Sequence, residues 1–267
     1  ALFASMGAGA MAINLQGANA GTGVLSSDHA GATTLTVDTP AAAATVAAPS
    51  VNAVAVTATK SSSLDLAVAS KMDYQGVVTA GEATSVNVAI AGQTSGAAEI
   101  VAGKAQSVVV SEVANNSILK VTANKATDLN VTATKDLSLA GSTLGGVQSL
   151  TVAAQTNFTS AGVAMGALNV ANLSGAGNIT LGDLGTTDMD YALTVNASNV
   201  GNLSIASLAT KNQAITLDAS KVVGTVGVTG AINAGTGDVN VNVNGTSGAV
   251  TLGGAITGKN VTIDATN

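Results

Sequence analysis

Residues 193–217, LTVNASNVGNLSIASLATKNQAITL, contain three copies of one short unit: an aliphatic residue, a small polar residue and a second aliphatic residue. The copies occupy residues 193–195, 203–205 and 215–217. Successive side chains of a β-strand point to opposite faces, so each copy places two aliphatic side chains on one face and the polar one on the other. Each copy therefore predicts a short strand that is buried on one face.

The same unit recurs along the chain, and from Leu168 onward its copies start about 10 to 14 residues apart. Two copies then make a repeat of about 20 to 25 residues, a period typical of solenoids. The spacers between copies contain Gly and Asn, which favour turns, and almost no Pro. Further copies lie at residues 35–37, 64–66, 86–88, 129–131, 137–139, 150–152, 168–170, 179–181, 226–228, 239–241, 250–252 and 261–263.

Two all-β architectures fit short, evenly spaced strands: a parallel β-helix or β-solenoid, and a string of antiparallel β-sandwich domains. Sandwich cores normally include aromatic anchors and strands of five or six residues. Only 1% of this chain is aromatic, Trp is absent, and many of the units span three to five residues. We therefore expect the solenoid, with tandem sandwiches as the alternative.

The regularity of the pattern divides the chain into three segments. Residues 1–50 form an irregular N-terminal segment that could hold a short helix within residues 1–30, and residues 39–50 (TPAAAATVAAPS) contain both prolines and predict a loop. We expect a less regular β-repeat region over 51–155 and regular solenoid repeats over 156–267.

Composition argues against several functional classes. The chain has nine cations, no Arg and a net charge of −6, so it lacks the clustered cations that nucleic-acid binding requires. Cysteine is absent, which excludes disulfides and thiol chemistry. No stretch is long and apolar enough to predict a membrane-spanning helix. One His, dispersed acids and no Arg also argue against an enzyme, and His29 is expected to be an ordinary loop residue.

Four aspartates are candidate calcium ligands, because calcium prefers carboxylate and carbonyl oxygens in turn-rich loops. Asp188 and Asp190, with Asp183 nearby, form the densest acidic group. Asp238 lies in residues 235–241 (GTGDVNV), which match part of the glycine- and aspartate-rich repeat of calcium-binding β-rolls. That match is a single copy and lacks the Asp expected at the position of Val239.

Asp218 and Asp264 follow equivalent strands in the segments 217–220 (LDAS) and 263–266 (IDAT). This repetition favours a shared structural role, in which each carboxylate accepts backbone N–H bonds in a turn. Triplets of the form Asn-x-Ser/Thr also recur, for example at 178–180, 202–204 and 260–262. We attribute them to the Asn- and Thr-rich repeat and not to glycosylation.

Residues 214–224 (AITLDASKVVG) and 261–266 (VTIDAT) resemble segments that recur in bacterial surface-layer proteins exported by type I secretion. The absence of Cys, the acidic balance and the Thr, Ala, Gly, Asn and Val usage are similar too. The resemblance implies a secreted protein that self-assembles into a lattice on the cell surface, stabilised by calcium.

We therefore expect a non-enzymatic structural subunit of an extracellular, self-assembling layer. Its main partner would be another copy of itself, with cell-surface polysaccharide as a second candidate. The rival hypothesis is a segment of a repetitive adhesin, an extracellular filament or a binding stalk.

Overall fold

The computed structural model describes residues 2–4, 9–16, 23–38, 50–95, 98–113 and 116–266. These residues form β-strands and connections with no helix, and every strand pairing among them is parallel. The chain is thus an all-β parallel β-solenoid, as the alternating pattern predicted, and not a string of antiparallel sandwiches. It divides into two compact units, residues 1–126 with 134–143 (unit 1) and residues 127–133 with 144–267 (unit 2).

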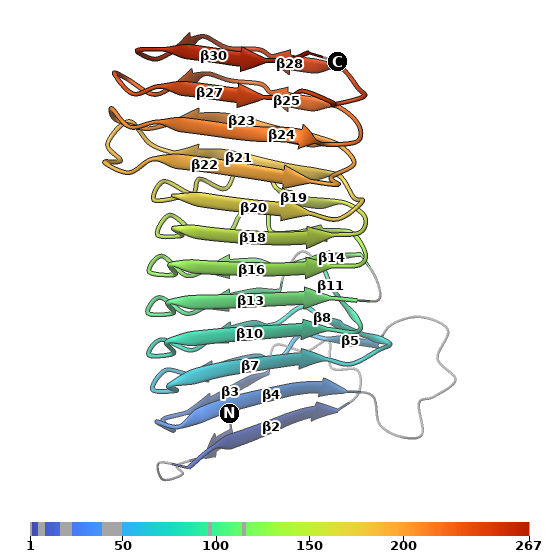
Figure 1. Ribbon diagram of the computed structural model, residues 1–267. Coiled ribbons are helices and arrows are strands. Elements are labelled where there is room, and N and C mark those ends of the chain that lie inside the picture. Colours follow the sequence, from blue (N-terminus) through green and yellow to red (C-terminus); the bar gives the residue numbers. More distant parts are fainter. Residues whose placement is uncertain are drawn as a thin grey trace. The chain divides into compact units, whose positions relative to one another are not determined.

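Unit 1 contains sixteen of the strands that the structure describes. Figure 1 labels several of them, among them β4, β7 and β10. Five of them, β2, β4, β7, β10 and β13, form its long sheet, and others form a second sheet in the order β1-β3-β6-β9-β12-β15 and a third in the order β11-β8-β5. The strands are β1 (Leu2–Ala4), β2 (Met11–Gln16), β3 (Val24–Ser27), β4 (Ala32–Asp38), β5 (Ser50–Asn52), β6 (Ala55–Ala58), β7 (Ser63–Val68), β8 (Met72–Tyr74), β9 (Val77–Thr79), β10 (Ser85–Ile90), β11 (Gln93–Thr94), β12 (Glu99–Val101), β13 (Ser107–Glu112), β14 (Ser117–Ile118), β15 (Lys120–Thr122) and β17 (Leu137–Ser138).

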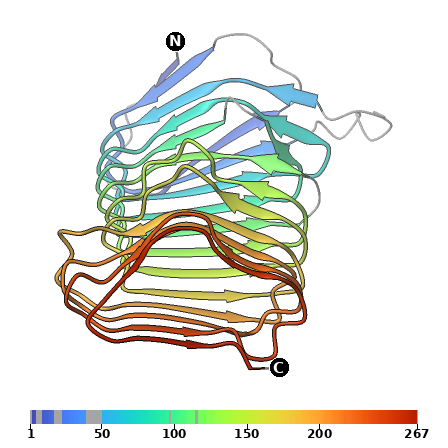
Figure 2. The same cartoon turned by 90° about the horizontal axis from the view of Figure 1, so that it is seen from above.

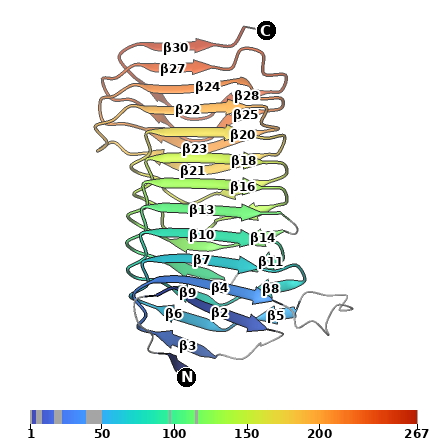
Figure 3. The same ribbon diagram turned by 60° about the horizontal axis from the view of Figure 1, so that its bottom comes forward.

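In unit 2 the strands of the long sheet follow the order β16-β18-β20-β22-β24-β27-β30, and those of a second sheet follow the order β19-β21-β23-β25-β28, in which β23 also pairs with β26 and β26 with β29. Figure 3 shows both sets of strands, and Figure 2 shows the last turns of the coil following one path. The strands are β16 (Asp128–Ala133), β18 (Ser149–Ala154), β19 (Phe158–Ser160), β20 (Val170–Ser174), β21 (Ile179–Gly185), β22 (Leu193–Ser198), β23 (Leu203–Ala209), β24 (Ile215–Lys221), β25 (Val226–Val228), β26 (Ile232–Asn233), β27 (Val239–Asn242), β28 (Val250–Leu252), β29 (Ile256–Thr257) and β30 (Val261–Asp264).

Each turn of the coil, called a rung below, stacks its aliphatic side chains on those of the rung before. In unit 2, Leu193 is in register with Ile215, Ile215 with Val239, and Val239 with Val261. These partners lie 22, 24 and 22 residues apart, within the predicted repeat length. Leu193, Ile215 and Val239 are fully buried. Burial of each such side chain stabilises the folded state by about 1.5–3 kcal/mol relative to leaving it exposed.

The region expected to be less regular has the same rung length. In unit 1, Leu64, Val86 and Val108 follow each other at 22 residues and are in register. Buried alanines occupy the turns here: the Ala83 N–H donates to the Ala80 carbonyl at 3.1 Å, and the same turn recurs at 102–105 and 123–126. Alanine fits a tight turn but is not one of the larger aliphatic residues that define the repeated unit. The sequence pattern of this region therefore looks less regular than its strands and turns are.

The N-terminal segment also differs from expectation. Its described residues form strands and their connections instead of a short helix, because β2 pairs along its length with β4. The unit boundary falls within residues 127–143 and not near 50 or 155. Of the predicted loop 39–50, residues 39–49 lie outside the described residues, and Ser50 begins β5.

Candidate functional surface

The outward side of the long sheet in unit 2 presents small polar side chains in columns that cross the strands. One column contains Thr194, Thr216, Asn240 and Thr262, which are register partners on β22, β24, β27 and β30. Neighbouring strands are about 4.8 Å apart, so each column is a row of hydroxyl and amide groups at that spacing. We call this surface the polar face of unit 2. Its second column contains Asn172, Asn196, Asp218, Asn242 and Asp264.

A row of asparagines links successive rungs at the start of the second sheet. The Asn178 side-chain amide donates to Asn157 Oδ1 at 2.8 Å, and Asn202 donates to Asn178 Oδ1 from its side chain at 2.7 Å and its backbone at 3.0 Å. The Thr225 N–H then donates to Asn202 Oδ1 at 2.7 Å. We call this row the asparagine ladder. Spacings of 21 and 24 residues between its asparagines match the repeat, which is a signal that the sequence contained.

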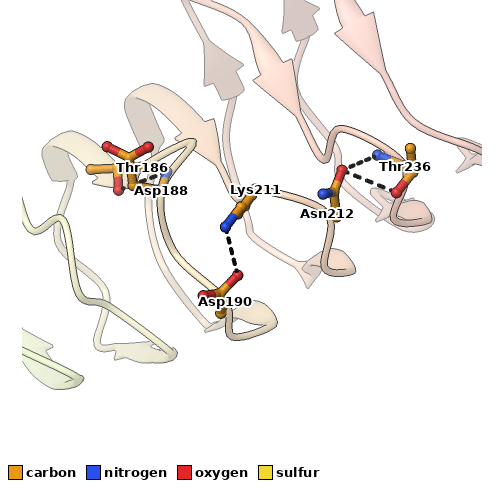
Figure 4. Close-up of polar contacts among 6 residues, drawn as sticks. All are labelled: Thr186, Asp188, Asp190, Lys211, Asn212 and Thr236. Atoms are coloured by element: carbon orange, nitrogen blue, oxygen red, sulfur yellow. Dashed lines mark hydrogen bonds and ion pairs between the residues drawn. The ribbon is translucent and has the colours of Figure 1, made fainter.

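The three acidic residues of the densest group have different surroundings, and Figure 4 draws two of them, Asp188 and Asp190. Asp190 forms an ion pair with Lys211, with Oδ1 and Nζ 3.5 Å apart, and the Asp188 backbone N–H donates to Thr186 Oγ1 at 3.4 Å. Both aspartates lie in the connection between β21 and β22. Asp183 is on β21 and accepts a hydrogen bond of 2.6 Å from Ser207 Oγ on the next rung.

Asp238 belongs to a different sheet from Asp183, because it directly precedes β27 of the long sheet. Its Oδ1 accepts a 2.8 Å hydrogen bond from the Asn260 side chain on the next rung. Thr236 lies in the glycine-rich turn before Asp238. Its N–H and its hydroxyl donate to Asn212 Oδ1 on the preceding rung, at 3.1 and 3.0 Å (Figure 4). Gly235 there has φ of +56°, a conformation that glycine tolerates best.

The two candidate calcium loops, one with Asp188 and Asp190 and one with Asp238, lie in different connections. Within the described residues, no three acidic or histidine side chains come close enough to hold a metal ion together. Asp183, Asp190 and Asp238 each contact a polar side chain on the following rung. Such contacts satisfy charged and polar groups between strands and so stabilise the stack.

Asp218 and Asp264 accept the predicted backbone N–H bonds, but Asp218 lies within β24, where the pairing with β22 shifts its register, and not in a turn after the strand. Asp218 Oδ1 accepts bonds from the Ser220 N–H at 3.2 Å and hydroxyl at 2.7 Å. Asp264 Oδ1 accepts the equivalent bonds from Thr266, at 3.3 and 2.8 Å. Hydrogen bonds from the Thr266 side chain, and secondly from its backbone, favour the carboxylate and lower the pKa of Asp264.

Buried polar groups in unit 1 were not predicted from the sequence. Tyr74 is buried and donates its hydroxyl to the Val54 carbonyl at 3.0 Å, and burial raises its pKa well above the usual range. The neighbouring Asp73 Oδ2 accepts bonds of 2.9 Å from Gln75 and Ser95. His29, expected in a loop, lies in the connection between β3 and β4 and is fully buried.

The described residues contain no helix that is long and apolar enough to cross a membrane. Comparison of the chain with models of protein families, with curated proteins and with solved structures found no match.

Proposed function

We propose that this chain is a structural subunit of an extracellular, self-assembling layer of the surface-layer kind. The observation that carries the proposal is how its polar groups are used. Asparagines 157, 178 and 202 bond to each other, and Asp183, Asp190 and Asp238 bond to side chains one rung away. Side chains that hold a stack together in this way stiffen a scaffold, since each bond restrains two rungs at once.

The polar face of unit 2 supports the same function. Seven of the nine side chains in its two columns are Thr or Asn, whose hydroxyl and amide groups can hydrogen-bond to an identical surface, and the other two are Asp218 and Asp264. Lateral contacts between copies through such faces would generate a sheet. The net charge of −6 suits a protein that stays soluble outside the cell.

Calcium would strengthen such a layer where carboxylates of neighbouring copies meet. Asp188 and Asp190 lie in an exposed connection and are the best placed of the four aspartates to face another copy. The alternative, a segment of an adhesin or binding stalk, would use the polar face for a polysaccharide instead of for a second copy.

The test is sedimentation velocity of the 267-residue chain with millimolar calcium and with a chelator. We expect large, ordered assemblies in calcium, and a shift to smaller species in the Asp188→Asn/Asp190→Asn variant if calcium bridges copies there. A matched control, Asp65→Asn, changes an outward-facing carboxylate of unit 1. A single small species under both conditions, together with binding to cell-surface polysaccharide, would contradict the layer and favour the adhesin.

A further inference from the structure

One strand of the third sheet in unit 1, β8, is buried on both of its faces. Its residues Met72, Asp73 and Tyr74 are all buried, whereas the outward residues of β7 and β10 are half-buried or exposed. Met72 and Tyr74 share one face, so Asp73 points to the other, beside its register partners Val51 and Gln93. A carboxylate therefore lies on the outward side of this sheet and is only 5% exposed.

The two carboxylate oxygens of Asp73 have unequal surroundings. Gln75 Nε2 and Ser95 Oγ each donate to Oδ2 at 2.9 Å. Oδ1 is shielded from water and has no hydrogen-bond partner among the described residues. Asp73 forms no ion pair in that part of the chain, and the nearest cation in the sequence, Lys71, is exposed. A buried carboxylate without an opposite charge is costly, and a bound cation would remove that cost.

The side chains around Asp73 carry the oxygen atoms that a hard cation prefers. Gln93 lies opposite Asp73 on β11, and Gln75 and Ser95 are its hydrogen-bond partners. Calcium binds carboxylate and amide oxygens and completes its coordination with water. Gln75 and Gln93 are half-buried, so both side chains can change rotamer to let an ion reach Oδ1 without any change in the strands.

We propose that Asp73 Oδ1 binds a calcium ion on the outward side of the third sheet, with the amide oxygens of Gln75 and Gln93 as further ligands. The ion compensates the buried charge and joins β8 to β11 on the next rung. This inference goes beyond the proposed function, because it concerns one copy of the chain and not a contact between copies. The site has one carboxylate, and calcium affinity rises with the number of charged ligands, so we expect a Kd of about 1 mM.

Terbium luminescence locates the ion, because terbium replaces calcium and emits light when a tyrosine close to it absorbs. The chain has no Trp and two Tyr, of which Tyr74 adjoins Asp73 and Tyr191 adjoins Asp190. We expect emission that calcium competes away, that Asp73→Asn and Tyr74→Phe abolish, and that Tyr191→Phe retains. Emission that survives in Asp73→Asn, or no emission from the wild type, would overturn the proposal. Dependence on Tyr191 alone would assign the ion to the connection that holds Asp188 and Asp190.

Chemical denaturation provides a second test that does not depend on tyrosine. Asp73→Asn keeps an oxygen that can accept the bonds from Gln75 and Ser95 and removes the buried charge. In a chelator its unfolding midpoint should be no lower than that of the wild type, because no uncompensated charge is buried. Calcium at about 10 mM should raise the midpoint of the wild type and leave that of Asp73→Asn unchanged.

The matched control is Asp65→Asn, which removes an outward carboxylate on β7 whose Oδ1 accepts a bond from Asn87. This variant should keep the calcium response of the wild type. An equal rise of the midpoint in the wild type and in Asp73→Asn, or no rise in the wild type, would contradict the site. Neither result bears on whether copies of the chain assemble, so this proposal and the proposed function fail separately.

Discussion

Replacement of Asn178 by Ala tests whether the asparagine ladder holds the rungs of unit 2 together. The substitution removes one donated and two accepted hydrogen bonds, of 2.8, 3.0 and 2.7 Å. A hydrogen bond contributes about 0.5–1.5 kcal/mol net, and these bonds are exposed to water, so values at the lower end apply. We expect the free energy of unfolding to fall by about 2 kcal/mol, measured by chemical denaturation.

Hydrogen exchange gives a local measure that does not depend on two-state unfolding, which repeat proteins often violate. The Asn202 amide donates to Asn178 Oδ1, so its protection should drop in Asn178→Ala. Protection of the Thr225 amide should persist, because its acceptor belongs to Asn202. Asn178→Asp keeps an acceptor for Asn202 and should retain most of that protection.

Asn130→Ala is the matched control, since Asn130 is an exposed asparagine on the outward side of β16. It should change the free energy of unfolding by less than about 0.5 kcal/mol. An Asn202 amide that exchanges equally slowly in the wild type and in Asn178→Ala would refute the role given to the ladder.

Three other substitutions test the core, the close approach of rungs and the terminal turn. Leu217→Ala leaves a cavity in a fully buried column and should lower the free energy of unfolding by about 3–4 kcal/mol in a denaturant titration. A loss below about 1 kcal/mol would contradict the close packing of Leu217 in the core. A Cβ at Gly177 would overlap the Thr156 backbone, so Gly177→Ala should lower the free energy of unfolding by about 3 kcal/mol in the same titration. Its control is Gly145→Ala, where an added Cβ meets nothing within 4 Å and the free energy of unfolding should hardly change. The pKa of Asp264 is lowered in the folded state, so the carboxylate stabilises the terminal turn at neutral pH, and this contribution is lost as pH falls through that lowered pKa. Thr266→Ala should raise the pKa of Asp264 toward its ordinary value in an NMR titration, and an unchanged pKa would show that the Thr266 hydroxyl has no effect.

The strands and the rung length followed from the sequence because they depend on local alternation. Leu193-Thr194-Val195 predicts which side chain is buried without knowledge of any partner strand. The position of Asp218 two residues before Ser220, repeated at Asp264 and Thr266, likewise predicted a hydrogen bond that involves only neighbouring residues. Features within a few residues of each other are therefore accessible from a single sequence.

Features that depend on register were harder to predict. The partners of Asp183, Asp190 and Asp238 lie 21 to 24 residues away, so these contacts with the next rung have no signature in the local sequence. Buried Tyr74 could not be recognised because its acceptor, the Val54 carbonyl, is a backbone group 20 residues away, in the connection between β5 and β6. Aligning the sequence at a repeat of about 22 residues would have brought Asn178 beside Asn157.

Electron microscopy of the purified chain tests the central claim most directly, because it shows whether copies assemble in an ordered way. The account predicts sheets or filaments with a regular subunit repeat, in which the polar faces contact neighbouring copies. Separate particles of one size at every protein concentration, with and without calcium, would contradict a self-assembling structural role.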